Sequence, residues 1–380
     1  MILAHVTTLY PGYVADFERR HTGLSALGYA EHYERLVRDA FGWSNHLTRH
    51  LAARGHVTAH FVANYAALQA KWLQENGAAS KQDPLHIVAE QLHRTRPEVL
   101  FVDDCYLFSP VRVQALCAEL PSLRLVVCHQ GLDGDPRQFF PDDALVLSPA
   151  GHQVATWRAA GVDAHQFRHA FEPAVREGLE THGPRTPVSF LGSCSPLLHP
   201  ERHRWLAALA RQMPLEIWTD SFAAVRPRLL VGSLRRGRAR QVVEHFFSPL
   251  RRRTHGPLYG RAMFAQLARS DITLNCHIAM AQPSAGNMRL FEATGAGACL
   301  VTDARRDLDE IFALDSEVVT YGSIEECVER VRWLLDHASA AAEIGARGQR
   351  RTLAAHTFAH RAAELEGLIE ARLKAGTGGR

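Results

Sequence analysis

The chain has 380 residues, enough for two domains of about 150 to 200 residues each. Hydrophobic residues make up 46% and charged residues 22% of it, which argues against a disordered, collagenous or coiled-coil protein. No stretch approaches the roughly 18 consecutive apolar residues of a membrane span, and residues 1–8 lack the basic start of a signal peptide. We therefore expect a compact cytoplasmic protein.

The basic residues are unusual in kind. Of the 43, three are lysines (Lys71, Lys81 and Lys374) and the other 40 are arginines. Phosphate recognition must therefore rest on arginine, backbone N–H groups and helix N-termini. The P-loop pattern and a lysine in a Schiff-base setting are both missing from the sequence, which argues against ATPases and pyridoxal enzymes. Seven widely spaced cysteines without a C-x-x-C pair predict neither a disulfide framework nor a zinc knuckle.

Strand and helix signals alternate through the first half of the chain. The expected strands are residues 2–6, 56–63, 99–102, 123–128 and 144–148. Between the first two, apolar residues from Tyr33 to Leu51 recur at helical spacing, and Asp83 followed by Pro84 marks another helix start. Such alternation is typical of a parallel sheet.

A polar segment rich in proline and glycine, residues 177–187, precedes a fresh strand and predicts a domain boundary. The strands expected after it are residues 188–191, 215–219, 272–275, 298–302 and 318–321. Residues 341–374 are helical by pattern. We predict an α/β protein with two Rossmann-like, doubly wound domains, residues 1–180 and 187–355, followed by a helix and tail at 356–380.

Residues 275–303 are the most informative window. A strand ends there, a Pro/Ser/Gly loop follows, and a helix is expected to start near Gly286 and Asn287, which would point free N–H groups at a ligand. Glu292 would lie about 7.5 Å along that helix, a reach that suits a carboxylate holding ribose behind a bound diphosphate. Arg289 would lie one turn nearer the phosphates. A solvated helix face is the alternative interpretation of the same residues.

Several separate blocks resemble one family, the CgeB-like (spore maturation protein type) glycosyltransferases. They are Asn287-Met-Arg-Leu-Phe-Glu-Ala-Thr-Gly-Ala-Gly297, Glu317-Val-Val-Thr-Tyr321, Arg351-Thr-Leu-Ala-Ala-His-Thr357, Thr7-Thr-Leu-Tyr-Pro-Gly12, Phe190-Leu-Gly-Ser193 and Leu274-Asn-Cys-His277. The likeness covers nearly the whole chain and is strongest between residues 271 and 361. Because the order and spacing of the blocks agree, the resemblance is more specific than any one block.

The resemblance implies the GT-B architecture, in which two Rossmann-like domains face each other across a cleft and the final helix crosses back to the first domain. It implies transfer of a sugar from a nucleoside diphosphate donor to an acceptor hydroxyl, an activity of class EC 2.4, with the donor in the second domain. In that family the matching positions place Glu292 on the ribose and Asn287, Arg289 and Gly286 near the diphosphate. Gly192 and Ser193 would approach the phosphates, and the segment with Gly256 and Tyr259 would contact the base. No metal and no cofactor are expected, since helix N-termini and arginine stabilise the leaving diphosphate.

Two features depart from the family pattern. Related retaining enzymes carry a second glutamate eight residues before the ribose-binding one, and that position is Ser284 here. Retention or inversion of the anomeric configuration therefore stays open. The other departure is the segment Arg226 to Arg253, which has nine arginines and one acid, Glu244.

An inverting reaction needs a general base in the first domain. Asp103 and Asp104 follow one strand and His129 ends another, so all three are expected at the carboxyl edge of the sheet. The alternative is that Asp104 caps a turn and His129 bonds only to backbone.

Two further features of the sequence bear on other functions. Histidines recur at i, i+4 five times (46/50, 56/60, 165/169, 199/203 and 356/360), but none carries the glutamate of H-E-x-x-H, so no metal site is expected. The arginine segment favours contact with an anionic acceptor or with the inner membrane face over specific nucleic-acid binding. A nucleotide-sugar epimerase of the same fold, or a non-catalytic protein that binds sugar nucleotides or polyanions, are the remaining alternatives.

Overall fold

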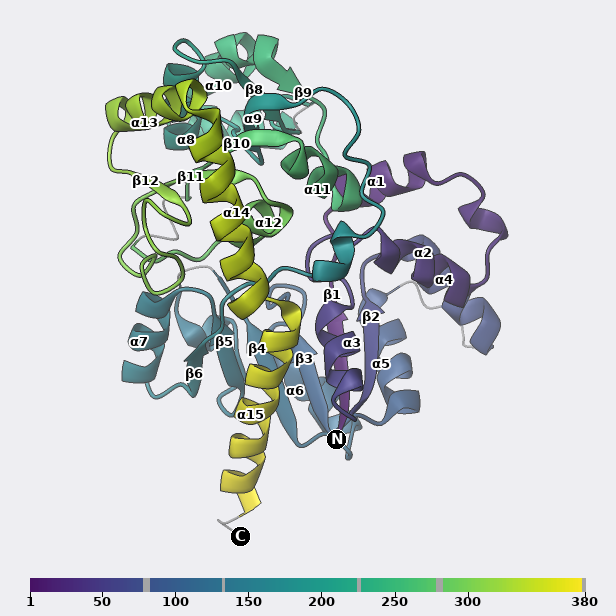
Figure 1. Cartoon of the computed structure of the whole chain (residues 1–380). Coiled ribbons are helices and arrows are strands. Elements are labelled where there is room, and N and C mark those ends of the chain that lie inside the picture. Colours follow the sequence, from purple (N-terminus) through teal and green to yellow (C-terminus); the bar gives the residue numbers. More distant parts are fainter. Residues whose placement is uncertain (78–82, 132–133, 224–226, 278–282, 378–380) are drawn as a thin grey trace. The chain divides into compact units, whose positions relative to one another are not determined.

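The computed structural model describes residues 1–77, 83–131, 134–223, 227–277 and 283–377 and divides into two compact units (Figure 1). The first unit joins Met1–His169 to Thr357–Arg380, and the second is Ala170–His356. The division lies before the polar break predicted at 177–187, because Phe171 already belongs to the second unit. Its backbone N–H donates to the carbonyl of His356 at 2.9 Å, and its ring meets that of Phe264.

The first unit is a parallel sheet of six strands in the order β2-β1-β3-β4-β5-β6. The strands are β1 (Ile2–Thr7), β2 (Val57–Val62), β3 (Val99–Val102), β4 (Leu125–His129), β5 (Leu145–Ser148) and β6 (Ala164–Gln166). The helices are α1 (Pro11–Arg20), α2 (Tyr29–Arg38), α3 (His46–Ala53), α4 (Ala66–Asn76), α5 (Pro84–Thr95), α6 (Pro110–Glu119), α7 (Gly151–Ala159) and α15 (Phe358–Thr377).

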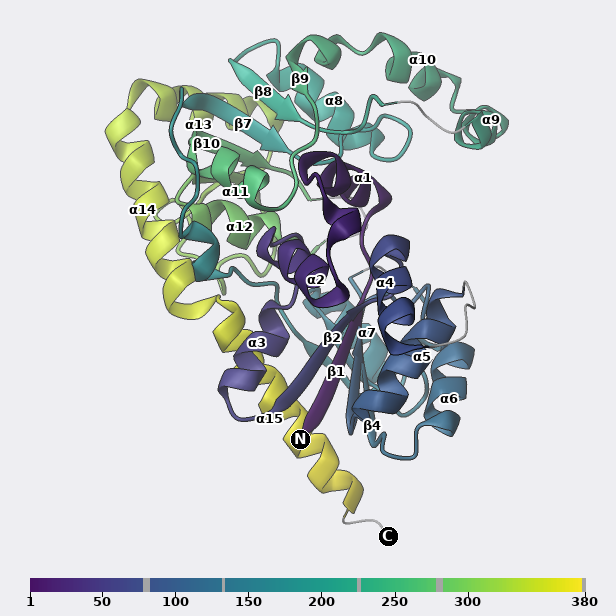
Figure 2. The same ribbon diagram turned by 90° about the vertical axis from the view of Figure 1, so that its right-hand side faces the viewer.

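The two faces of this sheet differ in chemistry. One carries the main apolar core and packs on α5, α6 and α7, where Leu92, Val113 and Trp157 meet the strand residues. The other is covered by α3 and α15, as Figures 1 and 2 both show, and carries His5 in register with His60. Histidine side chains are thus built into the layer between the sheet and these two helices.

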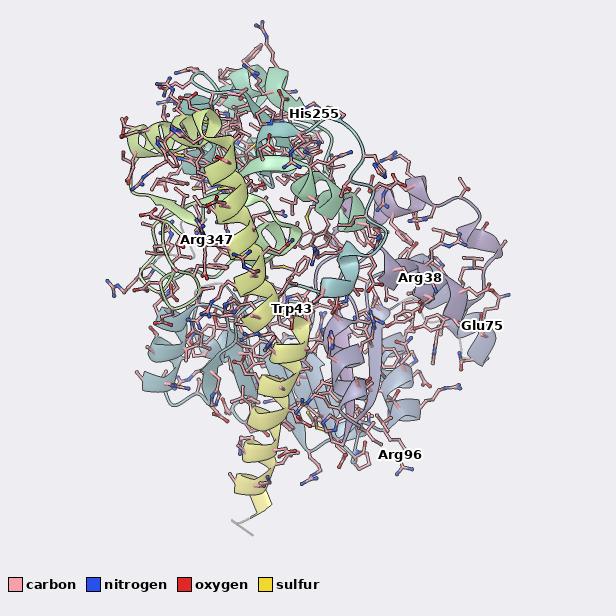
Figure 3. All side chains as sticks on the ribbon, in the orientation of Figure 1. Arg38, Trp43, Glu75, Arg96, His255 and Arg347 are labelled. Carbon is pink, nitrogen blue, oxygen red and sulfur yellow. The ribbon has the colours of Figure 1, made fainter. Side chains whose placement is uncertain are left out.

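The helix predicted from Tyr33 to Leu51 is two helices, α2 and α3. Between them the backbone takes positive φ at Ala40 (56°), Gly42 (63°) and Ser44 (45°), which no helix tolerates. The chain reverses direction at this turn, and the side chain of Trp43 is buried there. Trp43, labelled in Figure 3, contacts Phe358 at the start of α15 with ring centroids 6.1 Å apart.

The second unit is also a parallel sheet of six strands, in the order β12-β11-β10-β7-β8-β9. The strands are β7 (Thr186–Leu191), β8 (Leu215–Trp218), β9 (Thr254–His255), β10 (Ser270–Asn275), β11 (Cys299–Asp303) and β12 (Val319–Tyr321). The helices are α8 (Pro200–Leu209), α9 (Pro227–Arg235), α10 (Ala239–Phe247), α11 (Gly260–Ala268), α12 (Arg289–Ala296), α13 (Ile324–Asp336) and α14 (Ala338–Ala355). Taken in chain order this is the 3-2-1-4-5-6 order of a Rossmann fold.

Helices cover both faces of the second sheet. Trp205 and Leu206 of α8 and Val331 of α13 pack on one face, together with alternate strand residues such as Ile272. Helices α11 and α12 lie on the opposite face of the sheet and contact β10. The predicted α/β class with two doubly wound parallel sheets is therefore confirmed.

The C-terminal helical stretch predicted at 341–374 is two helices, α14 and α15. They are separated at His356 and Thr357, where α14 ends with His356 at φ −130° and ψ 42°. Helix α14 belongs to the second unit and α15 to the first. Among the described helices, none combines the length and the apolar character that crossing a bilayer requires. All seven cysteines are free thiols.

Candidate active site

The strand order of the second sheet reverses between β7 and β10, which are adjacent in the sheet. In open parallel sheets, ligands bind outside the carboxyl ends of the strands at such a reversal. Gly192 and Ser193 follow β7, and Cys276 and His277 follow β10. Gly192 has φ 151°, a conformation that L side chains rarely adopt, so its place at this edge depends on glycine. Two of the predicted donor residues therefore lie at the reversal point.

Arg202, in the first turn of α8, connects the two loops at this point. Its guanidinium donates to the carbonyl of Ser193 at 3.1 Å and to the carbonyl of Cys276. Burial lowers the pKa of Arg202, yet arginine stays protonated at neutral pH. No carboxylate lies within ion-pair distance of it in the described part of the chain. A half-buried cation without a carboxylate in ion-pair contact is suited to an anionic ligand.

A side-chain relay orients the start of α12. The Asn275 amide donates to Thr302 Oγ1 at 2.9 Å, and the Asn287 amide donates to Asn275 Oδ1 at 2.8 Å. Asn287 Oδ1 in turn accepts the backbone N–H of Leu290 at 3.3 Å. Asn287, predicted to lie near a diphosphate, therefore holds the helix start in place through its own side chain.

Glu292 lies nearer the helix start than the sequence predicted, because α12 begins at Arg289 and not near Gly286. It is 7% exposed, and one carboxylate oxygen is 2.9 Å from the Arg289 guanidinium. Burial raises the pKa of Glu292, and the charge of Arg289 opposes that rise. Arg289 also contacts Met263 Sδ at 3.1 Å, which brings the Arg289–Glu292 pair against α11.

The remaining predicted donor residues lie around these helices. Tyr259 immediately precedes α11, and Gly256 stands three residues before it on the same connection from β9. Gly286 lies in the loop before α12, where Asp307 accepts the N–H of Ala285 at 2.6 Å. Residues 278–282, in the middle of the predicted loop, fall outside the described residues. Ser284, which stands where related enzymes carry a second glutamate, is buried.

A second polar cluster joins the ends of β10 and β11. Asp303 accepts from His277 Nδ1 at 2.7 Å and from the His277 N–H at 3.0 Å, and it is paired with Arg305. Burial alone would raise the pKa of Asp303, but the hydrogen bonds from His277 and the charge of Arg305 lower it overall. The carboxylate is therefore ionised and holds His277, just after β10, against the end of β11.

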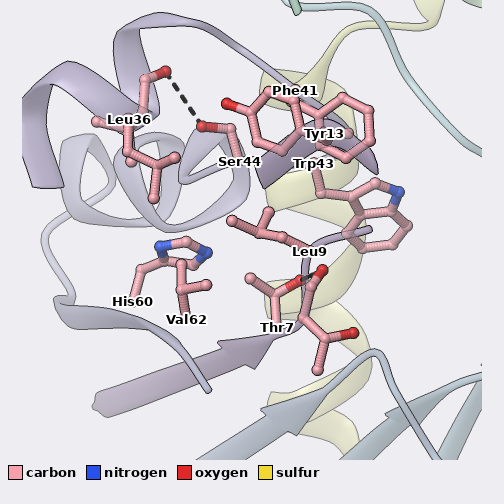
Figure 4. A pocket seen from close by; sticks show the side chains of 12 residues that line it. Thr7, Leu9, Tyr13, Leu36, Phe41, Trp43, Ser44, His60 and Val62 are labelled. Atoms are coloured by element: carbon pink, nitrogen blue, oxygen red, sulfur yellow. Dashed lines mark hydrogen bonds between the residues drawn. The ribbon is translucent and has the colours of Figure 1, made fainter. Parts of the chain in front are cut away.

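The first sheet has its own reversal point, between β1 and β3. Thr7 donates to Asp103 Oδ2 at 2.7 Å and Thr8 donates to Asp104 Oδ2 at 2.7 Å, so two parallel bonds join the ends of these strands. Beside Thr7 and Thr8 is a cavity of about 40 Å³, shown in Figure 4, which is walled by Tyr13 and Trp43 among others. That volume takes a water molecule or one small polar group of a ligand.

The three candidate bases differ in their contacts. Asp104 accepts the N–H groups of Tyr106 and Leu107 in addition to Thr8, so it caps a turn. Asp103 accepts from Thr7 and from His5 Nε2 (3.1 Å) through one oxygen only.

His129 is buried, with its Nε2 lacking a partner among the described residues, and its ring lies 4.7 Å from that of Trp43 and 5.6 Å from that of His169. Burial, with the neighbouring His169 and His5, lowers the pKa of His129 well below 6.5. The carboxylate of Asp103 therefore lies at the sheet edge, whereas the ring of His129 is buried within the first unit.

Sequence reasoning missed Arg202, Thr7 and Thr8. A signal for Arg202 was available: the helix after the first strand of a Rossmann domain starts at the ligand edge, and Arg202 stands in the first turn of that helix. Within the residues that the structure describes, no group of three or more His, Cys, Asp or Glu side chains is arranged to hold a metal ion.

Comparison with known proteins bears on both units. Residues 202–367 match the family model described as "Glycosyl transferase-like". A search of curated protein sequences gave no match.

Similar solved structures include HepE from Anabaena in complex with UDP-glucose (13% identity, TM-score 0.57, 97% of this chain and 99% of that one). Two others are AviGT4, a glycosyltransferase involved in avilamycin A biosynthesis (16%, TM-score 0.59, 99% and 98%), and sucrose-phosphate synthase from Thermosynechococcus elongatus (12%, TM-score 0.57, 98% and 100%). At these identities the likeness concerns the fold, so the chain has the GT-B fold and its residues 202–367 carry a glycosyl transferase-like segment.

Proposed function

We propose that the protein is a glycosyltransferase that moves a sugar from a nucleoside diphosphate donor to an acceptor hydroxyl. The observation that carries this proposal is Arg202, a half-buried cation at the reversal point of a Rossmann sheet, at the start of the segment that matches glycosyl transferases. Such a position suits the diphosphate of a nucleotide sugar. We further propose that the enzyme is CgeB-like, of class EC 2.4 and cytoplasmic; its free cysteines accord with a reducing compartment.

The donor is proposed to lie along α12 and α11. Arg202, with the N–H groups at the start of α12, would hold the diphosphate, and Gly192 and Ser193 would allow its close approach. Glu292 would accept hydrogen bonds from ribose hydroxyls, and the connection with Gly256 and Tyr259 would meet the base. Because HepE was solved with UDP-glucose, a uridine diphosphate sugar is the first donor to test.

Transfer is proposed to need neither a metal ion nor a cofactor. Charge develops on the β-phosphate as the sugar leaves, and fixed donors aimed at that oxygen stabilise it. Arg202 and the start of α12 can supply such donors. Activity that is unchanged in excess EDTA is the expected result, and loss of activity restored by Mg²⁺ would refute this part.

Two substitutions distinguish the residue proposed to hold the diphosphate from the residue proposed to hold the ribose. Arg202→Gln should weaken binding of both UDP and inorganic pyrophosphate by about 2 kcal/mol, since both carry the diphosphate. Glu292→Ala should weaken UDP binding by a similar amount of about 2 kcal/mol and leave pyrophosphate binding unchanged, since it acts on the ribose. Both are measured by titration calorimetry.

The matched controls are Arg204→Gln, an exposed arginine of the same helix α8, and Glu329→Gln, an exposed glutamate of α13. Neither control should change either affinity. Circular dichroism and thermal melting of each variant separate a binding loss from misfolding. Wild-type affinities in both test variants would remove the proposed donor site.

Asp103 is the proposed general base if transfer inverts the anomeric centre. Its carboxylate is oriented by Thr7 and His5 and keeps one oxygen outside those bonds. Asp103→Asn should keep the Thr7 bond and lower kcat by about 100-fold or more, with UDP affinity unchanged. Asp104→Asn should lower stability rather than kcat, because Asp104 caps a turn. A near-normal kcat for Asp103→Asn would exclude this role.

Analysis of the reaction product distinguishes glycosyl transfer from epimerisation of the donor sugar. An epimerase would convert the donor sugar without any acceptor, whereas a transferase gives a glycoside whose anomeric configuration is read by NMR. The arginine segment supports an acceptor that carries negative charge or lies at a negatively charged surface.

A further inference from the structure

Helices α9 and α10 form an insertion between β8 and β9 of the second sheet. They pack on each other and extend outward from the sheet edge in Figure 2. Arg226, the first residue of the arginine segment, lies outside the described residues. The stretch from Pro227 to Phe247, for which no element was predicted from the sequence, contains two short helices.

Each helix presents a row of exposed apolar side chains. On α9 these are Val231 and Leu234, at spacing i, i+3, and they are 47% and 52% exposed. On α10 they are Val243, Phe246 and Phe247, at spacing i, i+3, i+4, and Phe247 is 80% exposed. Residues at these spacings share one face of a helix. Five large exposed apolar side chains within 17 residues are more than an ordinary surface has, where exposed apolar residues occur singly and far apart.

The same segment is strongly basic. The arginines between residues 227 and 253 are Arg228, Arg235, Arg236, Arg238, Arg240, Arg251, Arg252 and Arg253. Glu244 is the one acid of that stretch, and it is already paired with Arg240 at 2.8 Å. Arg253 is paired with Glu216 at 3.8 Å, and the other arginines leave the segment with a clear excess of positive charge.

The insertion is fixed at its base, so the exposure of these rows follows from the fold. His203 Nε2 on α8 lies 2.8 Å from the hydroxyl of Ser248 just after α10, and Leu250 is fully buried. Arg251 donates to the carbonyl of His245 and stacks over the ring of Phe222 at 5.0 Å. His245 is buried while its neighbours Phe246 and Phe247 point outward.

We propose that the α9–α10 face binds the surface of a bilayer that contains anionic lipid. The arginines flank the apolar side chains, since Arg228 stands three residues before Val231 and Arg240 three before Val243. Basic side chains beside exposed Phe, Leu and Val suit a helix that lies in the headgroup region. Anionic lipids attract each nearby arginine, and the apolar side chains enter the acyl boundary. A soluble polyanion or a nucleic acid would use the charge but leave Val231, Leu234 and Val243 in water. A second copy of the chain would bring two strongly positive faces together.

This inference goes beyond the proposed reaction and does not rest on it. Binding to vesicles needs no nucleotide and no acceptor, so it can succeed if the transferase assignment fails, and the reverse also holds.

The test is sedimentation of the full chain with vesicles of phosphatidylcholine alone and with one quarter phosphatidylglycerol. We expect binding to the anionic vesicles only, weakened by salt. Leu234→Ser with Phe247→Ser should lower the partition coefficient by about tenfold through lost apolar insertion. Arg235→Gln with Arg252→Gln should lower it by a similar factor of about ten at low salt.

Matched controls change the same residue types elsewhere. Val111→Ser removes a side chain on α6 that is 75% exposed, and Arg49→Gln with Arg350→Gln removes two exposed arginines of α3 and α14. These variants should bind vesicles like the wild type, and melting curves verify that every variant is folded.

Three results would overturn the proposal. The first is no sedimentation with anionic vesicles. The second is undiminished sedimentation of the Leu234→Ser, Phe247→Ser variant, which would leave a purely electrostatic polyanion site. The third is a dimer in sedimentation velocity that the same variant abolishes, which would make the face an interface between copies.

Discussion

At the scale of single residues, the buried histidines of the first unit make its stability depend on pH. Trp43 Nε1 donates to His169 Nδ1 at 3.2 Å, which requires that nitrogen to be unprotonated. Burial, with the charge of Arg361, lowers the pKa of His169 to about 4. Between pH 6.5 and 4 the unfolded chain therefore binds a proton that the folded chain does not. The free energy of unfolding should fall as the pH falls through that window, by about 1.4 kcal/mol per pH unit for this residue.

His169→Gln keeps an acceptor for Trp43 but cannot titrate, so it should flatten this dependence. Urea unfolding of the first unit at pH 7.5 and 5.5 measures the effect. His93→Gln, at a histidine of α5 that is 45% exposed on its side chain, is the control and should leave the slope as it is. An equally steep slope in His169→Gln and the wild type would contradict the prediction.

The candidate site divides into residues that the sequence could indicate and residues that it could not. Spacing along one expected helix start indicated Glu292 and Arg289, and the resemblance to the glycosyltransferase family added Asn287. Arg202 acts through the carbonyls of Ser193 and Cys276, and Cys276 is 74 positions away. Such bonds depend on which strands are neighbours, which no local pattern contains.

At the scale of elements, α14 packs so closely on the second sheet that two of its residues must be glycine. A Cβ on Gly348 would lie 2.4 Å from the carbonyl oxygen of Glu317, and one on Gly345 would lie 2.8 Å from that of Gly297. Gly348→Ala should therefore lower the free energy of unfolding by about 1–3 kcal/mol, since backbone must shift to admit the methyl group.

Gly367 provides the opposite case in the next helix. It is exposed on α15, and a Cβ there would meet no atom within 4 Å. Gly367→Ala should raise stability by about 0.5–1 kcal/mol because alanine loses less entropy in a helix. Denaturant unfolding of both variants checks the pair, and destabilisation by Gly367→Ala would show that the packing of α15 was misjudged.

Element boundaries show where periodicity misleads. The apolar spacing from Tyr33 to Leu51 is real, but the chain reverses through positive φ at Ala40 and Ser44, two residue types that carry no turn signal of the strength of glycine or asparagine. The apolar side chains of α9 and α10 also recur at helical spacing in the sequence. Because they face outward among many arginines, this helical pattern was not recognised.

At the scale of the whole chain, the first unit is completed by the last helix. Leu365 and Ile369 of α15 are fully buried, Leu47 and Leu51 of the adjoining α3 are too, and α3 and α15 contact each other. Glu366 accepts a bond from His56 at 2.7 Å and is paired with Arg54. Leu365→Ala should destabilise the first unit by about 2–5 kcal/mol through the lost contacts and the cavity.

Calorimetry should resolve this as a lower melting temperature for one of two transitions. UDP should raise only the other transition, because the proposed donor site lies wholly in the second unit. Leu198→Ala, at a leucine that is 57% exposed in the second unit, is the control and should move neither. Equal shifts of both transitions by Leu365→Ala would mean that the units unfold together.

The order of the strands could be anticipated only in outline. Alternating strand and helix signals predicted two parallel sheets, and both are present. Strand β10 returns to the side of β7 and so creates the reversal point. This placement depends on the right-handed crossover and on packing across the whole unit. The division at residue 169, rather than at the polar break, has a similar cause, because Phe171 finds its partners far along the chain at His356 and Phe264.

The place of α15 in the chain sets an order of events during synthesis. The ribosome delivers α3 early, yet the helix that covers it follows only after the entire second unit has been made. Until then Leu47 and Leu51 lack the helix that covers them in the folded unit, so a nascent chain has an exposed apolar strip. A chain that ends just after His356 has every residue of the second unit but lacks α15 of the first, so only full translation closes both cores.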